Sequence, residues 1–337
     1  MENIRYSLNG MRMDFEIRDV PIGFVNALRR ILLAEIPAVT VTNVNIVKNT
    51  TQLTHEMLRH RMEMLPINVK PEEADVVRDT KLELLFSASP EAREITTHDF
   101  VVTGPRDNVI LKDRDLNTDL YFMKLGPNES LHIKANIGMD LGGAVGSQVC
   151  VATFRNHVDP DQAAADRDLF LTDAINKLPQ EMREALKDDE INRLQQEAGR
   201  VFDNFYVQRS FHKGEDGRAD WFDFTIESIG VVPAAELLRK AVEVLQAKIL
   251  EWVRLPILRE DAGWYRLEQD GETFTIGQLV QEMIYKSAIA DFVSRDIGHP
   301  LTPKLVVRFH TPAQPETVIE DFHRGAIALC KSILKSV

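Results

Sequence analysis

Residues 21–37 read Pro-Ile-Gly-Phe-Val-Asn-Ala-Leu-Arg-Arg-Ile-Leu-Leu-Ala-Glu-Ile-Pro. Their apolar residues recur at helical spacing and predict a helix with a buried stripe of Phe24, Leu28, Ile31 and Leu32. Pro21 suits the first turn of this helix, and Pro37 ends it because proline has no amide donor. The opposite flank carries Asn26, Arg29 and Arg30. The simpler interpretation of this flank is a solvated face. The alternative is a surface for a large partner, because arginine is enriched at interfaces and binds carboxylates through two hydrogen bonds.

Two more long amphipathic helices are predicted, at residues 233–253 and 315–335. Alternating strands surround them, and the sequence Thr-Ile-Gly-Gln at 275–278 has the form of a capping box that opens a further helix. Residues 21–24 open a helix in a similar way, so the chain holds two like units, each too small to bury a core alone. The residues that we assign to pairing of the long helices are Leu238, Val242, Leu245, Ile249, Phe322 and Leu329. The predicted fold class is therefore α+β, with two pseudo-symmetric dimerisation units of the alpha-subunit type in one chain and a mostly β domain inserted in the first.

The expected domain bounds follow changes in sequence pattern. Residues 1–48 and 210–258 form the first unit, and residues 262–337 form the second. Between the two parts of the first unit, residues 49–157 contain short strand-like runs separated by Pro, Gly and Asp, which is typical of an inserted β domain. Residues 158–209 are strongly polar with sparse apolar anchors, which favours a partly helical surface excursion.

Composition excludes several classes of protein. The chain of 337 residues has 52 acidic and 40 basic residues, a net charge of −12, so we expect no direct nucleic-acid contact. Its two cysteines, Cys150 and Cys330, lie far apart in sequence and predict neither a cysteine-rich metal site nor a disulfide scaffold. The N-terminus lacks an apolar signal core, and no apolar run approaches the about 18 residues of a membrane span. We therefore expect a soluble protein of a reducing intracellular compartment, with no membrane contact.

No motif predicts catalysis, a metal ion or a cofactor in this chain. His55 and His60 are five residues apart, whereas a zinc-protease helix needs a spacing of four to bring both rings to one ion. Residues 113–117 lack the glycine and distal glutamate of a calcium loop, and the glycines at 142–146 lack the spacing of a phosphate loop. A metal-dependent hydrolase using His55 and His60 remains an alternative, which the metal content of the purified protein would decide.

Several stretches resemble subunits of multisubunit RNA polymerases. Residues 26–37 resemble the signature helix of their alpha-like assembly subunits, and residues 49–67, which include His-Glu-Met-Leu-Arg-His-Arg-Met-Glu-Met-Leu-Pro-Ile, resemble the archaeal D and eukaryotic third subunits. Residues 221–230 are similar to the return of that family's dimerisation domain. Residues 272–279 and the His-Pro-Leu-Thr-Pro-Lys turn within 298–304 resemble the archaeal L and eukaryotic eleventh subunits. The resemblance therefore describes both partners of a heterodimer fused in one polypeptide.

The resemblance implies a non-catalytic subunit of a DNA-directed RNA polymerase, a nucleotidyltransferase complex. In such a complex the two fused units form a platform that nucleates assembly. Asn26, Arg29 and Arg30 map to the helix that faces the second-largest subunit. Further implied partners are the largest subunit and small zinc-bearing subunits. With Cys150 alone in the inserted domain, the zinc loop or iron–sulfur cluster of some relatives is not expected. Residues 159–209 have no counterpart that we can align.

This fusion is associated with large nucleocytoplasmic DNA viruses. A viral subunit would occupy the host cytoplasm or the virus factory, with the virion as a further location. A free-standing interaction scaffold that uses the same dimerisation fold is the alternative function.

Overall fold

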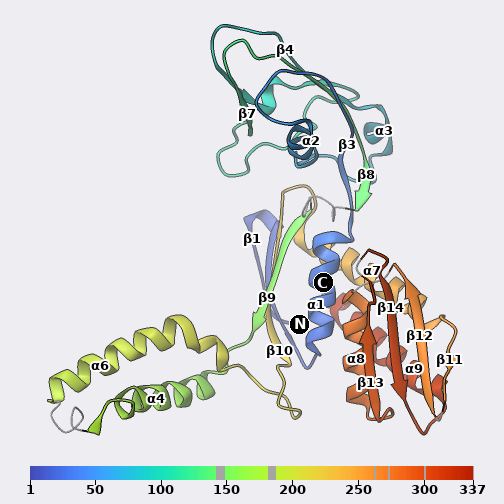
Figure 1. Cartoon of the computed structure of the whole chain (residues 1–337). Coiled ribbons are helices and arrows are strands. Elements are labelled where there is room, and N and C mark those ends of the chain that lie inside the picture. The colour runs from blue at the N-terminus through green and yellow to red at the C-terminus, as the bar shows by residue number, and fades with distance from the viewer. Residues whose placement is uncertain (142–148, 181–186, 262, 272–273, 300, 337) are drawn as a thin grey trace.

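Two similar units lie side by side in the computed structural model, each an antiparallel four-stranded sheet with two helices (Figure 1). The structure describes residues 1–141, 149–180, 187–261, 263–271, 274–299 and 301–336. The first unit contains, in sheet order, β1 (Glu2–Ser7), β2 (Arg12–Arg18), β10 (Trp221–Ser228) and β9 (Cys150–Asn156), with helices α1 (Ile22–Ala34) and α7 (Ala234–Val253). The second contains β11 (Leu258–Arg259), β12 (Trp264–Asp270), β14 (Lys304–His310) and β13 (Phe292–Asp296), with helices α8 (Phe274–Ser287) and α9 (Pro315–Leu334). This arrangement confirms the predicted fold class.

A hydrophobic cluster runs through both units and is centred on α7 and α9. The predicted pairing residues Leu238, Val242, Leu245, Ile249 and Phe322 are all buried in it. The rings of Trp252 and Phe322 meet edge to face, with their centroids 5.2 Å apart. Such pairs add about 0.5–1.5 kcal/mol to the gain from burial alone. The two units therefore share one core rather than touching at a wet interface.

Leu329, the sixth predicted pairing residue, packs against the edge of this core rather than inside it. Cys330 is fully buried, as is Ala326, whereas Leu329 is half-buried and lines a groove with Met283 of α8. The core-facing stripe of α9 steps four residues from Phe322 to Ala326 and four more to Cys330, so position 329 is rotated towards α8. A step of three residues, from Ala326 to Leu329, fits helical spacing equally well. The sequence pattern alone therefore could not decide between Leu329 and Cys330 as the next core residue.

The inserted domain has its own sheet and its own hydrophobic cluster. It contains β3 (Pro37–Asn49), β8 (Leu131–Leu141), β4 (Lys81–Phe86) and β6 (Val101–Thr103) in sheet order, the pair β5 (Arg93–Thr96) and β7 (Tyr121–Leu125), and helices α2 (His55–Glu63) and α3 (Ala74–Asp79). β3 pairs with β8 from Pro37 onwards, while β9 pairs with β10 of the first unit. β3 therefore belongs to the inserted domain and β9 to the first unit, so the domain boundaries differ from those expected at residues 49 and 157. The sequence could not show this, because alternation within a strand does not reveal which sheet the strand joins.

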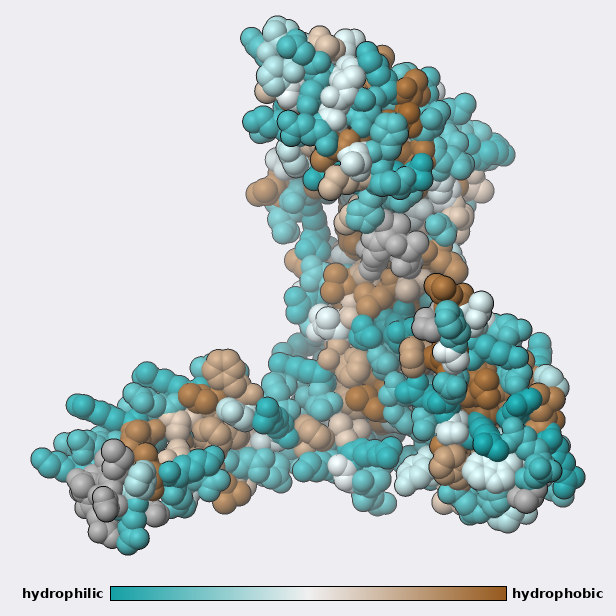
Figure 2. Space-filling model, viewed as in Figure 1, coloured by the Kyte–Doolittle hydropathy of each residue, from teal (hydrophilic) through white to brown (hydrophobic). Residues whose placement is uncertain are grey.

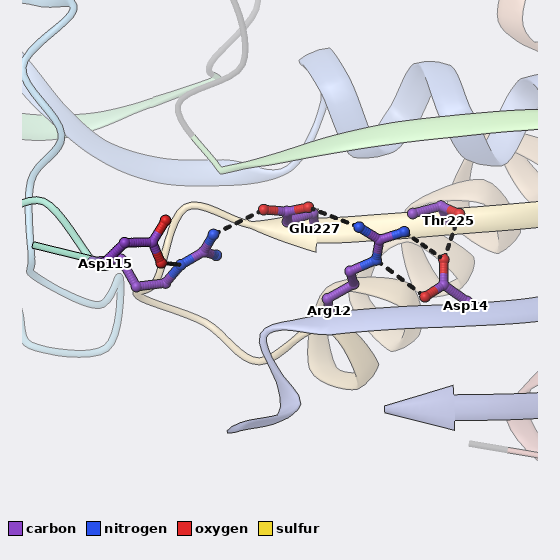
Figure 3. Close-up of polar contacts among 6 residues, drawn as sticks. Arg12, Asp14, Asp115, Thr225 and Glu227 are labelled. Atoms are coloured by element: carbon purple, nitrogen blue, oxygen red, sulfur yellow. Dashed lines mark hydrogen bonds and ion pairs between the residues drawn. The ribbon is translucent and has the colours of Figure 1, made fainter. Parts of the chain in front are cut away.

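An ion-pair path connects the inserted domain to the first sheet (Figure 3). Arg114 Nη2 of the insert lies 3.0 Å from Glu227 Oε1 on β10, and Arg12 Nη1 on β2 lies 3.6 Å from Glu227 Oε2. Arg12 Nε donates to Asp14 Oδ2 at 3.0 Å, and the Thr225 hydroxyl donates to Asp14 Oδ1 at 2.6 Å. The hydrogen bond from Arg12 holds the pKa of Asp14 below its ordinary value. These groups are partly exposed, so the path orients the insert more than it stabilises it.

The polar excursion forms a helical hairpin that projects from the base of β9 and β10 (Figure 1). It contains α4 (Pro160–Asn176), α6 (Asp188–Val201) and the π-helical turn Phe202–Tyr206. Asp159 caps α4 by accepting hydrogen bonds from the amides of Asp161 and Gln162. The expectation of a partly helical excursion is met by these elements.

Both cysteine thiols are expected to be unreactive in the folded protein. Cys150 and Cys330 are buried, and loss of hydration raises the pKa of each to about 12. Because the thiolate is the nucleophile, only about one thiol in ten thousand is ionised at pH 8. Iodoacetamide at pH 8 should leave the native mass unchanged and should add two adducts in 8 M urea, as intact mass spectrometry would show. Rapid labelling of the native protein would mean that the core shared by the two units is open.

Candidate functional site

The candidate site is the seam where α1 of the first unit meets α8 of the second. The Gly23 amide at the start of α1 donates to Glu282 Oε2 at 2.6 Å. A Cβ atom at Gly23 would lie 3.1 Å from both Cα and N of Leu279. The two helices therefore approach backbone to backbone, and a carboxylate of one unit accepts from the helix N-terminus of the other, where negative charge is favourable.

A chain of hydrogen bonds continues along the seam to Arg29. Glu282 Oε1 accepts from Gln278 Nε2 at 2.9 Å, and Gln278 Oε1 accepts from Asn26 Nδ2 at 3.3 Å. Asn26 Oδ1 then accepts from both Nε and Nη2 of Arg29, at 3.2 and 3.1 Å. Arg29 itself is half-buried. Side chains of the second unit thus fix the direction in which an arginine of the first unit points.

Arg30 takes part in a second network inside the molecule. Its Nε donates to the Thr275 hydroxyl at 3.1 Å, and that hydroxyl donates to Glu35 Oε1 at 3.0 Å. Glu35 Oε2 also lies 2.9 Å from Lys248 Nζ of α7. Asn26 and Arg30 are therefore in contact with the second unit, on a flank for which the sequence predicted either solvent or a large partner. Sequence reasoning missed Thr275, Gln278 and Glu282 as members of the site.

The predicted capping box at 275–278 is wrong. α8 begins at Phe274, so Thr275 lies inside its first turn. The Thr275 hydroxyl is used between Arg30 and Glu35 instead of on the helix backbone. A polar residue near a helix start has the same sequence signature whether it caps its own helix or binds a neighbouring one.

The structure also places the residues of the rejected catalytic motifs. His55 and His60 are both exposed on α2, whose first turn is capped by the Thr54 hydroxyl. Asp113 accepts from the amides of Asp115 and Leu116, so residues 113–117 form a turn closed on its own backbone. The glycines at 142–146 lie outside the described residues.

Among the described residues, Glu16, His157 and Asp223 form a group that could in principle hold a metal ion, because their ligand atoms lie within 4.8 Å of one another. Glu16 lies directly opposite Asp223 across β2 and β10. Arg155 Nε lies 2.9 Å from Asp223 Oδ2, and Trp221 Nε1 donates to Glu16 Oε2 at 3.1 Å. The positively charged guanidinium of Arg155 binds the Asp223 carboxylate and would repel a metal cation there. Glu16, His157 and Asp223 therefore fit an ion-pair cluster better than a metal site.

A cavity of about 650 Å³ lies between the inserted domain and the turn after β10. Its cationic side chains are paired with carboxylates: Lys112 Nζ lies 3.4 Å from Asp119, and Arg114 lies 3.0 Å from Glu227. This balanced lining does not single out an anionic or a cationic ligand. Within the described part of the chain, no helix is both long enough and apolar enough to cross a membrane.

Comparison with known proteins gives the family. The pattern of the RNA polymerase Rpb3/Rpb11 dimerisation domain matches the chain twice, at residues 14–249 and at residues 265–336. A Tetrahymena thermophila protein named "Conjugation stage-specific protein" is 24% identical, over 74% of this chain and 94% of its own length. The Arabidopsis thaliana "DNA-directed RNA polymerases II, IV and V subunit 3" is 23% identical, over 72% of this chain and 86% of its own. The Methanobrevibacter smithii "DNA-directed RNA polymerase subunit Rpo3" is 24% identical, over 71% and 92% respectively. The first match spans most of the chain and the second spans the remaining unit, so the chain belongs to the RNA polymerase Rpb3/Rpb11 dimerisation-domain family, as two alpha-like units fused in one polypeptide.

Proposed function

We propose that this chain is a non-catalytic assembly subunit of a multisubunit DNA-directed RNA polymerase. The observation that carries the proposal is the hydrophobic core shared by the two units through α7 and α9. A pair of dimerisation domains that shares a core inside one chain is already a complete platform, with no second chain needed to close it. The net charge of −12 suits a subunit that lies away from the nucleic acid.

We further propose that the seam binds the second-largest subunit, with Asn26, Arg29 and Arg30 at the contact. Arg29 is the residue that would reach the partner. Two of its N–H groups bind Asn26, and a guanidinium has five such donors. Asn26 positions Arg29, and Arg30 ties α1 to α8. The contact would therefore form only when both units are folded together, which links assembly to correct pairing.

Reversing the charge of Arg29 tests this surface. Arg29→Glu should reduce recovery of the second-largest subunit with the tagged chain by roughly 30-fold or more, because breaking one desolvated charge pair costs about 2 kcal/mol or more. The matched control is Arg59→Glu on α2, an arginine with 48% of its side chain exposed. Arg30→Glu is not a clean test, since Arg30 also holds the two units together. Both variants should keep the wild-type circular dichroism. Full recovery with Arg29→Glu would remove the seam from the interface.

Purification of the tagged chain also distinguishes a polymerase subunit from the alternative function, a free-standing interaction scaffold. Recovery of the largest and second-largest subunits together, with small zinc-bearing subunits, supports the polymerase role. Their absence supports the scaffold. We also propose that the chain holds no metal or cofactor, which elemental analysis of the isolated chain would test, with stoichiometric zinc as the contrary result. The fusion of two units supports a viral source, in which assembly would occur in the host cytoplasm or virus factory.

A further inference from the structure

The helical hairpin at residues 159–209, here called the arm, is a self-contained element. Its two helices, α4 and α6, pack on each other, and Phe170 of α4 lies 5.7 Å from Phe202 and 5.0 Å from Tyr206 of the π-helical turn between ring centroids. Arg167 Nε on α4 lies 3.1 Å from Asp203 Oδ1 on the other side. At its base, the Asp159 amide donates to the Ser210 carbonyl at 3.0 Å, so the two ends of the arm lie together. The arm thus stands on a narrow base with most of its surface outside the shared core (Figure 1).

Large apolar side chains on the arm remain in water. Leu169 on α4 is 66% exposed and Phe205 in the π-helical turn is 73% exposed, although Phe202 in the same turn is buried. Figure 2 shows apolar side chains among hydrophilic ones on the visible face of the arm. Burial of a leucine or phenylalanine side chain is worth about 1.5–3 kcal/mol each. Two such side chains on a projecting element provide anchors for another molecule.

The charge around these anchors is negative. Residues 159–209 contain 12 Asp and Glu against 7 Lys and Arg, which gives a net charge of −5. On α4, Asp161, Asp168 and Asp173 are exposed, and Asp173 is one helical turn from Leu169. Within the described residues, none of these three carboxylates has a hydrogen-bond or ion-pair partner, whereas Asp166 on the inner side accepts from Ser210 at 2.6 Å. Leu169, Phe205 and these three aspartates are called the arm surface here; they are exposed apolar and negatively charged side chains of one projecting element.

We propose that the arm surface binds a lysine- or arginine-rich segment of another protein that also carries apolar side chains. The negative charge of the arm favours a positively charged partner. A nucleic acid or an anionic lipid surface has the same sign as the arm and would be repelled. A second copy of the chain, with its net charge of −12, would be repelled as well. The proposal goes beyond the polymerase role, because the arm lies apart from the α1–α8 seam.

Photocrosslinking from position 205 tests the proposal in cells that produce the full chain. p-Benzoylphenylalanine in place of Phe205 adds a benzoyl group, which a side chain that is 73% exposed can accommodate. The crosslinked partner is identified by mass spectrometry after tag purification under denaturing conditions. The control position is Leu301, which is 86% exposed on the second unit. The expected crosslink from position 205 falls in a segment of another protein with net positive charge. Because purification is denaturing, this result does not depend on polymerase membership.

Charge reversal supplies the second measurement. Asp168→Lys with Asp173→Lys should lower the crosslink yield from position 205 at least tenfold, and 0.5 M salt should weaken it likewise. The matched control, Glu316→Lys with Glu320→Lys, makes the same charge change on exposed residues of α9 and should leave the yield unchanged. Unchanged circular dichroism excludes unfolding. The proposal is overturned by a crosslink to nucleic acid, to a second copy or to an acidic segment, by no crosslink above the Leu301 level, or by a yield that charge reversal does not lower.

Discussion

Replacing Leu245 with aspartate should unfold the two-unit body under conditions in which the native protein remains folded. Leu245 lies in the middle of α7 with none of its surface exposed, among side chains of both units. The substitution removes a buried leucine side chain, which is worth about 2–5 kcal/mol, and leaves a carboxyl group without a partner in an apolar core. The expected loss of about 5 kcal/mol or more is comparable to the total stability of many domains, about 5–15 kcal/mol. Burial would also raise the pKa of the new carboxyl, so the loss should be smaller in mild acid.

Tryptophan fluorescence during urea unfolding measures this effect selectively. Trp221, Trp252 and Trp264 all lie in the two units and none lies in the inserted domain, so the signal follows the shared core. The matched control is Leu250→Asp on the same helix, at a position 39% exposed, which should cost less than about 1 kcal/mol. If both variants unfold at the same urea concentration, α7 and α9 do not form the core on which the proposed platform depends.

The long amphipathic helices could be predicted because their apolar spacing is a local signal. The stripe Phe24, Leu28, Ile31 and Leu32 is buried as predicted, and the helices predicted at residues 233–253 and 315–335 match α7 and α9. Burial of one helix face or one strand face requires only that the apolar residues repeat with the right period. The positions of these helices and their buried faces can therefore be predicted from the local sequence alone.

The seam could not be predicted beyond the polar residues of α1. Asn26 meets Gln278, and Arg30 meets Thr275, across about 250 residues of sequence. Polarity shows that Asn26, Arg29 and Arg30 avoid the core, but it does not distinguish a side chain facing water from one that binds a second helix. The same ambiguity produced the wrong capping box at Thr275. The sheets that β3 and β9 join could not be predicted either, because pairing between strands that are distant in sequence has no local signature.

Replacing Gly23 with valine should push α1 and α8 apart at the seam. Glycine is a poor helix former, and alanine in its place would ordinarily favour the helix by about 1 kcal/mol. Here a Cβ atom would already lie 3.1 Å from the Leu279 backbone, which cannot move as a flexible side chain can. The additional methyl groups of valine would enter α8 itself, and overpacking of this kind costs about 1–3 kcal/mol. The steric term should therefore outweigh the gain in helix propensity, for a net loss of up to about 2 kcal/mol. The hydrogen bond from the Gly23 amide to Glu282 should break as well.

Gly325→Ala on α9 is the control for this prediction, because it also adds a Cβ atom at a contact between helices. There the nearest atom is the flexible end of Met283, at 2.9 Å, which can move aside, so helix propensity should prevail and stability should stay the same or rise. Urea midpoints by tryptophan fluorescence would compare the two variants. Binding of the second-largest subunit would show whether the displaced seam also misplaces Arg29. The close approach of α1 and α8 would be contradicted if Gly23→Val were as stable as Gly325→Ala. If Gly23→Val lost stability but kept full binding, the backbone contact would be structural and Arg29 would reach its partner without the alignment provided by α8.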